Sequence, residues 1–356
     1  MSRHPRPQRL ARRPTVTVVV PCYNYGHYLP TAVGSVLEQP GVDVELILID
    51  DASPDGSAGV VRDLAARDRR VRPILHASNR GHIGTYNEGL ADARGDYVVL
   101  MSADDALTPG ALERATALLE AHPSVGFVYG HPMEFADEPP PVSQRVRGWT
   151  VWSGADWIER RCRTGRNCIL SPEVVMRTSV LREIGLYDPA LPHSGDFGLW
   201  LRAAVVSDVG RVDGPAQAYY RVHDQNMHLT QYVGHLVDLE GRRAAFEKAL
   251  VGSDAQIPRG RELLAMARRA LAGAGLECAR SACDHGRAEI EPIDQYMDFA
   301  ARAWPAVQRT RAWRALERRG ERDARALHHS PAAWSRRLQE SIILHLRWRR
   351  WRWTGT

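Results

Sequence analysis

The first 130 residues alternate between short apolar runs and stretches with helical spacing, and this alternation constrains the fold more than any other feature. The apolar runs are rich in Val, Ile and Leu; they lie at 15–20, 44–50, 71–76, 96–101 and 125–130. The helical patterns lie between them, at 28–39, 56–68, 85–93 and 109–122. Strands that are apolar along nearly their whole length are typical of a parallel sheet with helices on both faces. The sequence therefore predicts an α/β domain built on a mostly parallel sheet.

The rest of the chain divides into regions of different composition. A basic leader, 1–13, precedes the first strand and is predicted to be disordered. A Pro-rich loop at 136–144 leads into a mixture of short strands and helices, and from 236 to 356 the pattern is almost wholly helical. We predict one α/β domain over 14–235, with two halves that meet near residue 130, followed by a helical C-terminal region. The 356 residues are enough for this arrangement.

Charge and cysteine content exclude some classes of function. Lys and Arg outnumber Asp and Glu by 47 to 42, which gives a formal net charge of +5. This mild excess fits a phosphorylated substrate, an anionic membrane or nucleic acid. The five cysteines are odd in number and form no CxxC pair, which argues against a zinc site or a disulfide framework. No stretch approaches the roughly 20 apolar residues of a spanning helix, and the run at 15–20 is too short for a secretory signal, so we predict a cytoplasmic protein.

Polar segments follow four of the predicted strands. They read PCYNYGHY (21–28), DDASPDGS (50–57), ASNRGHIGTYN (77–87) and SADD (102–105). Because the carboxyl ends of parallel strands meet at one edge of a sheet, these segments are expected to converge. A single acidic pair is usually solvated or caps a helix, but four polar loops at one edge indicate a binding site.

The acidic pair Asp104–Asp105 lies between a strand and a helix, for which Thr108 is the expected N-cap and Pro109 the first residue. Two adjacent like charges are costly unless a cation neutralises them. Carboxylate oxygens suit Mg²⁺ or Mn²⁺, which in turn holds a diphosphate. The loop after the first strand is not GxGxxG and the chain has no P-loop motif, so neither of those nucleotide-binding modes is expected.

Four segments together resemble the nucleotide-sugar glycosyltransferases of family 2, which have the GT-A fold. They are VVVPCYNYGHYLPTAVGSVLEQ (18–39), ELILIDDASPDGS (45–57), NRGHIGTYNEGLADARGDYVVLMSADD (79–105) and SGDFGLWLRAA (194–204). The resemblance covers about residues 14–230. It implies a Rossmann-like domain that transfers a hexose-type sugar with inversion from a nucleoside diphosphate, with a UDP-sugar as the expected donor and Mn²⁺ or Mg²⁺ as the cofactor.

The resemblance also implies roles for individual residues on the donor side. The residues expected to bind the donor are Pro21, Tyr23, Asn24, Asp51, Asn79, Arg80, Gly81 and Asp104. The first three would shape the pocket for the base, and Asp51 would bind the base itself. The segment from Asn79 to Gly81 would lie near the nucleotide, with Asn87 on the helix that follows. Asp50 is more simply explained as a residue that orders its loop.

Asp104 and Asp105 stand where the family has its DXD-type motif. Asp105 is therefore expected to bind the metal, and Asp104 the ribose or the donor sugar. The literal sequence is Ala-Asp-Asp, which leaves the division between the two acids open. His223 matches a late histidine that in many members approaches the metal or the diphosphate, although an isolated histidine is also often a packing residue. Arg221 fits a role in stabilising the same loop.

Asp196 is the general base that the resemblance implies, and it would take the proton from the acceptor hydroxyl. The family usually has Glu-Asp here, whereas this chain has Gly195 before Asp196, so a contact to the acceptor is in doubt and the base is kept. From the residues alone, Asp196 also fits a helix N-cap. In the helix that follows, Leu199, Trp200 and Ala203 are expected to face inward.

Two alternative functions stay open. A nucleotidyltransferase also uses a parallel sheet and acidic metal ligands, but it would be expected to carry a Gly-rich basic loop after the first strand. A catalytically silent nucleotide-sugar-binding protein is disfavoured by the retention of Asp51, Asp104, Asp105 and Asp196. The sequence does not indicate the sugar, the linkage, the oligomeric state or the acceptor, which could be a carbohydrate, a lipid-linked molecule or a small molecule.

The C-terminal tail, SIILHLRWRRWRW at 341–353, interleaves Trp and Arg. Such a segment is typical of a membrane interface, although in a helical projection its arginines surround the axis and do not line one face. We predict either a shallow, mainly electrostatic contact with an anionic membrane or a solvated or packed tail. Nucleic acid is not an expected partner, because no base-stacking module accompanies the tail.

Overall fold

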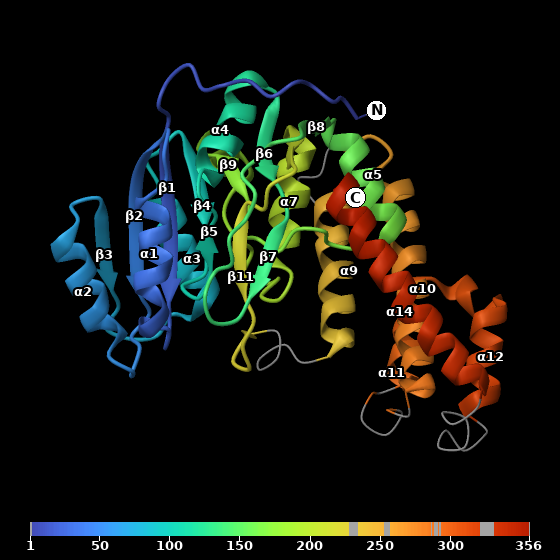
Figure 1. The fold of residues 1–356 in the computed structure, drawn as a ribbon. Coiled ribbons are helices and arrows are strands. Elements are labelled where there is room, and N and C mark those ends of the chain that lie inside the picture. The colour runs from blue at the N-terminus through green and yellow to red at the C-terminus, as the bar shows by residue number, and fades with distance from the viewer. Residues whose placement is uncertain are drawn as a thin grey trace. The chain divides into compact units, whose positions relative to one another are not determined.

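The computed structural model describes residues 2–227, 234–252, 257–285, 287, 291, 293–320 and 331–355. They form two compact units (Figure 1). The α/β unit comprises residues within 1–157 and 169–224 together with Gly355, and the helical unit comprises 158–168 together with residues within 225–354. The boundary expected at 236 therefore lies near 225, and a short segment of the expected α/β domain belongs to the helical unit.

The α/β unit is built on an eight-stranded sheet with the order β3-β2-β1-β4-β9-β6-β10-β8. Its strands are β1 (Thr15–Cys22), β2 (Asp43–Asp50), β3 (Val71–Leu75), β4 (Tyr97–Leu100), β6 (Val125–Tyr129), β8 (Gly148–Trp152), β9 (Val175–Arg177) and β10 (Asp208–Asp213). Strands β3, β2, β1 and β4 are parallel neighbours, and so are β6 and β10. Strand β9 runs antiparallel between β4 and β6, and β8 is an antiparallel edge. The predicted α/β fold with a mostly parallel sheet is confirmed.

Helices cover both faces of this sheet, as the apolar strands predict. The helices that lie within the unit are α1 (Leu29–Leu37), α2 (Ser57–Arg67), α3 (Gly81–Ala91), α4 (Ala111–Ala121), α6 (Thr178–Ile184) and α7 (Gly195–Val206), with the short helix η1 (Gly26–Tyr28). Helix α5 (Gly154–Thr164) begins in this unit, and its residues from 158 onward belong to the helical unit. One face carries α1 and α4, whose apolar side chains join the main core. On the other face, a Cβ at Gly89 of α3 would lie 2.3 Å from Val19 Cγ1, so the glycine lets the helix approach the sheet closely.

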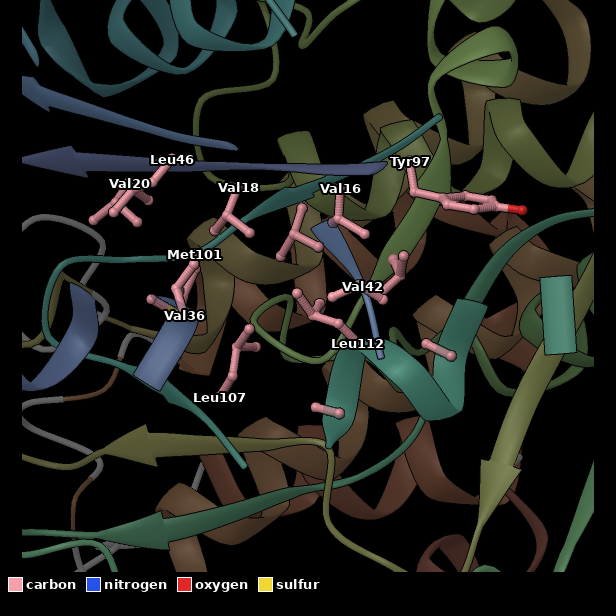
Figure 2. Close-up of a cluster of buried hydrophobic side chains, with 14 of the residues drawn as sticks. Val16, Val18, Val20, Val36, Val42, Leu46, Tyr97, Met101, Leu107 and Leu112 are labelled. Atoms are coloured by element: carbon pink, nitrogen blue, oxygen red, sulfur yellow. The ribbon is translucent and has the colours of Figure 1, made fainter. Parts of the chain in front are cut away.

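The main core lies between the sheet and the helices α1 and α4. Figure 2 shows alternate β1 residues, Val16, Val18 and Val20, pointing from the sheet toward the layer that contains the α4 residue Leu112; Leu46 of β2 belongs to the same cluster. All five side chains are fully buried. Because side chains alternate along a strand, β1 contributes to both faces of the sheet, and Val19 faces α3 on the other side.

Two sequence-based expectations at element boundaries are wrong. Helix α4 begins at Ala111 after Gly110 with φ 73°, and the Thr108 hydroxyl donates to Ala216 O instead of capping the helix. The basic leader, expected to be disordered, makes specific contacts: Arg3 pairs with the backbone of Val151, and the Arg12 guanidinium bridges two carboxylates of the α/β unit. The partners of these arginines are distant in sequence, and the composition of the leader does not reveal them.

A small second sheet, with the order β5-β11-β7, stands beside the end of β4. Its strands are β5 (Ala106–Leu107), β7 (Pro132–Phe135) and β11 (Ala218–Arg221). Strand β11 pairs antiparallel with β5, which directly follows the acidic pair. This pairing brings the segment around residue 221 to the residues that follow β4.

The helical unit contains α9 (His235–Val251), α10 (Gly260–Asp284), α11 (Ile293–Ala303), η2 (Pro305–Arg309), α12 (Arg311–Gly320) and α14 (Pro331–Thr354). In α10, the residues Leu263, Leu264, Ala267 and Leu271 have helical spacing and are buried. Within the described residues, we find no helix with the length and apolarity needed to cross a membrane.

Candidate active site

The carboxyl ends of β1, β2 and β4 meet at one edge of the sheet. Cys22 is the register partner of Asp50, and the N–H of Asp51 donates to Cys22 O at 2.9 Å. Strand β1 lies between β2 and β4. Strands β2 and β3 were added on one side of β1 and β4 on the other, so the strand order reverses at this point. Such switch points are where open α/β sheets bind ligands.

Asp51 is a buried acid that is held by several donors. Its Oδ1 accepts from the backbone N–H of Arg80 at 2.8 Å and lies 2.7 Å from His76 Nδ1. The other ring nitrogen of His76 and the Arg80 guanidinium both contact Glu88. Burial alone would raise the pKa of Asp51, but the hydrogen bonds from His76 and Arg80 outweigh it and hold the pKa below its ordinary value. An ionised carboxylate is thus prepared at this position.

The other residues expected at the nucleotide surround Asp51. Asn79 donates to Asp51 O at 3.3 Å and accepts from the N–H of Gly81, so it orders the turn into α3. The side chains of Asn79 and Arg80 are exposed and can reach a ligand. In the first loop Tyr23 is 44% exposed next to Pro21, the penultimate residue of β1.

Asn24 has the uncommon φ of 62°, and its N–H donates to Ser53 Oγ. Its Oδ1 is buried and finds no hydrogen-bond partner among the described residues. A buried, unpartnered amide oxygen in a loop at the sheet edge is well placed to accept an N–H from a ligand. Asp50, in contrast, accepts from the N–H of Ser53, which agrees with the loop-ordering role expected for it.

Asp104 and Asp105 are both buried at the end of β4, with different surroundings. Asp105 Oδ1 accepts from the N–H of Arg221 at 3.0 Å. Burial first, and then the charge of Asp104, raises the pKa of Asp105 well above its ordinary value. A nearby positive charge would therefore stabilise the ionised forms of the two acids.

His223 and Arg221 reach the acidic pair from β11 and the loop that follows it. His223 Nε2 lies 3.0 Å from Asp104 Oδ2. The Arg221 guanidinium donates to Asp104 O, Ala136 O and Asp137 O and lies over the Tyr28 ring. It therefore stabilises the loops around the pair, as expected.

The donor set fits a divalent cation. Two ligands at right angles on an ion with bonds of about 2.1 Å lie about 3 Å apart. Asp104 Oδ2 and His223 Nε2 lie 3.0 Å apart, which is a hydrogen-bonding distance that is also close to this spacing, and the buried Asp105 is the next residue in the chain. Within the described ranges, three side chains of ligand type do not gather into one cluster, so a cation here would complete its shell with water or ligand oxygens.

Asp196 lies in the first turn of α7, and two hydroxyl groups hold its carboxylate. Tyr187 donates to Oδ1 and Ser171 donates to Oδ2, each at 2.5 Å. Burial, and then the charge of Asp196, raises the pKa of Tyr187 well above its ordinary value, so the hydroxyl keeps its proton and donates. The N-cap of α7 is Ser194, so the expectation that Asp196 caps the helix is wrong. The expected inward residues Leu199, Trp200 and Ala203 are buried.

Asn87 connects this carboxylate to α3. Its amide donates to Tyr187 O and accepts from Tyr187 N–H, both at 2.9 Å. The helix that begins beside the nucleotide residues thereby fixes the tyrosine that orients Asp196. The sequence placed Asn87 on this helix but did not reveal its partner, which lies 100 residues away.

Glu173 is a buried acid that sequence reasoning missed. Its Oε1 accepts from the N–H of Leu170, while Oε2 is buried with no hydrogen-bond partner in the described part of the chain. Burial, opposed by backbone hydrogen bonds and assisted by the charge of Asp196, raises its pKa to about 7. Its charge also acts on Asp105. The sequence feature that could have indicated it is a single acid within the mainly apolar stretch ILSPEVVM (169–176).

Comparison with protein families finds a match to the model described as "Glycosyl transferase family 2", over residues 17–182. An uncharacterized glycosyltransferase from Nostoc sp. is 27% identical over 223 residues, which cover 60% of this chain and 67% of that protein. The matched segments span 30%, 21% and 40% of the length of three further curated relatives.

Solved structures share the fold. TarS from S. aureus in complex with UDP has a TM-score of 0.60 at 17% identity, with 88% of both chains covered. The mannosyltransferase PcManGT from Pyrobaculum calidifontis, in complex with GDP-Man and Mn²⁺, has a TM-score of 0.56 at 19% identity, with 94% of this chain and 86% of that chain covered. At these identities the likeness concerns the fold.

Proposed function

We propose that this chain is a glycosyltransferase of family 2, whose model matches residues 17–182; the chain has a GT-A-type α/β fold with a helical C-terminal region. It transfers a sugar from a nucleoside-diphosphate sugar, with a UDP-sugar as the expected donor, to an acceptor hydroxyl with inversion. The observation that carries the proposal is the carboxylate of Asp196, which two hydroxyl donors orient in the same unit as Asp51 and the acidic pair.

The donor nucleotide is proposed to bind at the loops after β1, β2 and β3. Asp51 is ionised and buried, and its second oxygen accepts from the base. Asn24 Oδ1 is a further acceptor without a protein partner. The exposed side chains of Asn79 and Arg80 lie next to Asp51, where Arg80 can meet a phosphate. Tyr23 and Pro21 border the base, and Gly81 begins the helix beside the phosphates.

We propose that Asp105 and His223 hold Mn²⁺ or Mg²⁺, with Asp104 near the ribose or the donor sugar. When bound, such an ion neutralises the diphosphate and stabilises it as a leaving group. The raised pKa of Asp105 supports this assignment, because a buried acid next to a second acid gains most from a nearby cation. Arg221 keeps the loop that carries His223 against the pair.

Asp196 is proposed to act as the general base. It takes the proton of the acceptor hydroxyl while that oxygen bonds to the anomeric carbon and the bond from that carbon to the diphosphate breaks. The attack comes from the side opposite the leaving group, so the configuration inverts. Proton removal of this kind contributes roughly 10²- to 10⁴-fold to the rate. Tyr187 and Ser171 orient the carboxylate and leave its charge in place.

The acceptor is proposed to be a carbohydrate, a lipid-linked molecule or a small molecule, in polysaccharide, glycolipid or glycoconjugate biosynthesis. Contact with an anionic membrane surface through the C-terminal tail belongs to the same proposal and is argued below. A place in the cytoplasm, with attachment at the membrane periphery, is the corresponding prediction of location.

A nucleotide screen followed by a transfer assay tests the function. Thermal shift with nucleoside diphosphates and nucleotide sugars, with and without Mn²⁺, should identify a donor that stabilises the protein only when metal is present. Release of the nucleoside diphosphate from that donor should follow, and NMR of the product should show the inverted anomer. Release of pyrophosphate from a nucleoside triphosphate would instead indicate a nucleotidyltransferase. Binding without turnover across a broad acceptor panel would indicate a silent binding protein.

A further inference from the structure

One side of α14 is fixed within the helical unit. The Arg336 guanidinium forms two-pronged hydrogen bonds with the buried carboxylate of Asp284, and Arg337 donates to Asp284 O. Further along the helix, Trp351 Nε1 donates to Cys168 O at 2.9 Å. These contacts fix which side of α14 faces inward and therefore which side faces outward.

The opposite side of α14 is apolar and exposed. Trp334, Leu338, Ile342 and Leu346 are spaced four residues apart, and Trp353 follows seven residues after Leu346. This spacing places all five on one side of a helix, and we name them the outer face of α14. Their exposed fractions are 62%, 50%, 51%, 56% and 67%. A row of large apolar side chains with half or more of its surface in water marks an interaction site.

The charged side chains of α14 on or beside the outer face are all positive. Arg349 and Arg350 are exposed on or beside it, and Arg352 lies over the ring of Trp348. The sequence of α14 contains a single acid, Glu340, which lies on the inward side and is partly buried. Two copies of this face would bring arginines against arginines, whereas an anionic lipid surface supplies both an apolar layer and compensating phosphates.

We propose that the outer face of α14 docks onto an anionic lipid bilayer, with the helix lying in the plane of the interface. The Trp and aliphatic side chains enter the boundary between headgroups and acyl chains, and Arg349 and Arg350 pair with lipid phosphates. The sequence predicted a shallow, electrostatic contact because the arginines surround the helix axis. The inward contacts of Arg336, Arg337 and Trp351 change this expectation, since they leave the apolar side outward. The proposal does not depend on which sugar is transferred.

Vesicle binding of the full-length protein tests the proposal. It should sediment with vesicles that mix phosphatidylglycerol with phosphatidylcholine, and bind much less to phosphatidylcholine alone. Added salt should weaken the binding without abolishing it, because only the arginine contribution is screened. Brominated lipids should quench tryptophan fluorescence, which reports insertion without any mutation. Absence of binding to anionic vesicles at low salt would overturn the proposal.

Two sets of variants separate the apolar from the charged contribution. The triple variant Leu338→Ser, Ile342→Ser, Leu346→Ser should bind at least about tenfold more weakly, with unchanged helix content by circular dichroism. The double variant Arg349→Gln, Arg350→Gln should lose most of the salt dependence. The matched control replaces exposed valines outside α14, with Val206→Ser, Val237→Ser and Val251→Ser, and should bind normally.

The remaining outcomes distinguish a lipid bilayer from a second copy of the chain as the partner of the outer face of α14. If the triple variant instead abolishes a dimer seen by sedimentation without lipid, and vesicle binding is absent, the face joins two copies of the chain and the lipid proposal is wrong. An equal loss in the valine control would likewise overturn it. Transfer to a soluble acceptor should be unchanged in the triple variant, because the proposed site residues all precede residue 224. Failure of the proposed function and failure of the membrane proposal are thus distinguishable.

Discussion

Two buried acids at the same sheet edge have opposite surroundings. Asp51 directly follows β2, and Asp105 lies in the loop after β4. Both side chains are almost completely buried. Donors around Asp51 hold its pKa below the ordinary value, whereas burial and the charge of Asp104 raise that of Asp105. One acid is therefore satisfied by the protein, and the other has too few positive partners.

This difference divides the site into two sides. On the proposed nucleotide side, His76 and the N–H of Arg80 already stabilise the carboxylate of Asp51, so its orientation is fixed without a ligand. On the proposed diphosphate side, the acidic pair has too few positive partners, and a bound cation would stabilise it. Binding of metal and donor should therefore be coupled on one side of the site, and removal of single residues should show it.

The largest effect is expected from Asp105→Ala. Removal of this carboxylate should eliminate the Mn²⁺-dependent part of nucleoside diphosphate binding and reduce turnover below detection, because the ion loses its buried partner. Isothermal titration calorimetry with and without Mn²⁺ measures the first effect. Glu138→Ala, an exposed acid in the Pro-rich loop, is the matched control. Unchanged binding in the presence of metal would show that Asp105 is not a ligand.

A smaller but still large effect is expected from Asp196→Asn. The amide cannot take a proton, so turnover should fall by about 10²-fold or more, while the donor affinity stays close to that of the parent protein. Tyr187→Phe removes one of the two hydroxyl donors and should lower turnover less, with a change in its pH profile. Steady-state kinetics together with donor titration separates these effects. Near-normal turnover of Asp196→Asn would show that Asp196 is not the general base. The proposals for the nucleotide and the metal would be unaffected.

Glu173, the buried acid whose charge acts on Asp105, offers a test by protein stability. Its folded-state pKa of about 7 lies above the unfolded value, so the group favours folding at low pH and this contribution is lost as the pH rises through about 7. Glu173→Gln removes the ionisation. Without added metal, its free energy of unfolding should exceed that of the parent protein by about 1–3 kcal/mol at pH 8, and by much less at pH 5.

Urea unfolding at the two pH values measures the Glu173 effect. Glu183→Gln, which replaces an exposed acid on α6, should show little dependence on pH. If both variants behave alike, the buried carboxyl of Glu173 does not carry a high pKa, and its influence on Asp105 and Asp196 disappears with it.

Much of this site is readable from sequence because it lies where strands end. Asp51, Asp104 and Asp105 each follow an apolar run, and a parallel sheet brings such ends together without further information. The position of Asp196 at the start of a helix was also visible, although its interpretation as a cap was wrong, because Ser194 occupies that place. Local pattern thus locates the acids but not their partners.

The partners depend on contacts distant in sequence. Tyr187 meets Asn87 across 100 residues, and Ser171 reaches Asp196 across 25. Both lie near β9, a three-residue antiparallel strand inserted between β4 and β6, which no periodicity reveals. The same holds for the helical unit, where the pattern predicted helices but not that residues 158–168 belong to it.

The smallest effect concerns the satisfied acid, Asp51. Because its folded-state pKa is lowered, its contribution to stability is present above the unfolded value of 3.8 and is lost as the pH falls below it. Asp51→Asn should therefore cost about 1 kcal/mol of unfolding free energy at pH 7 and progressively less toward pH 3. Asp63→Asn, an exposed acid on α2, is the control and should change stability little at either pH. A cost for Asp51→Asn that is the same at pH 7 and pH 3 would mean that the donors around Asp51 do not favour its ionised form. The contrast between the two sides of the site would then rest on the acidic pair alone.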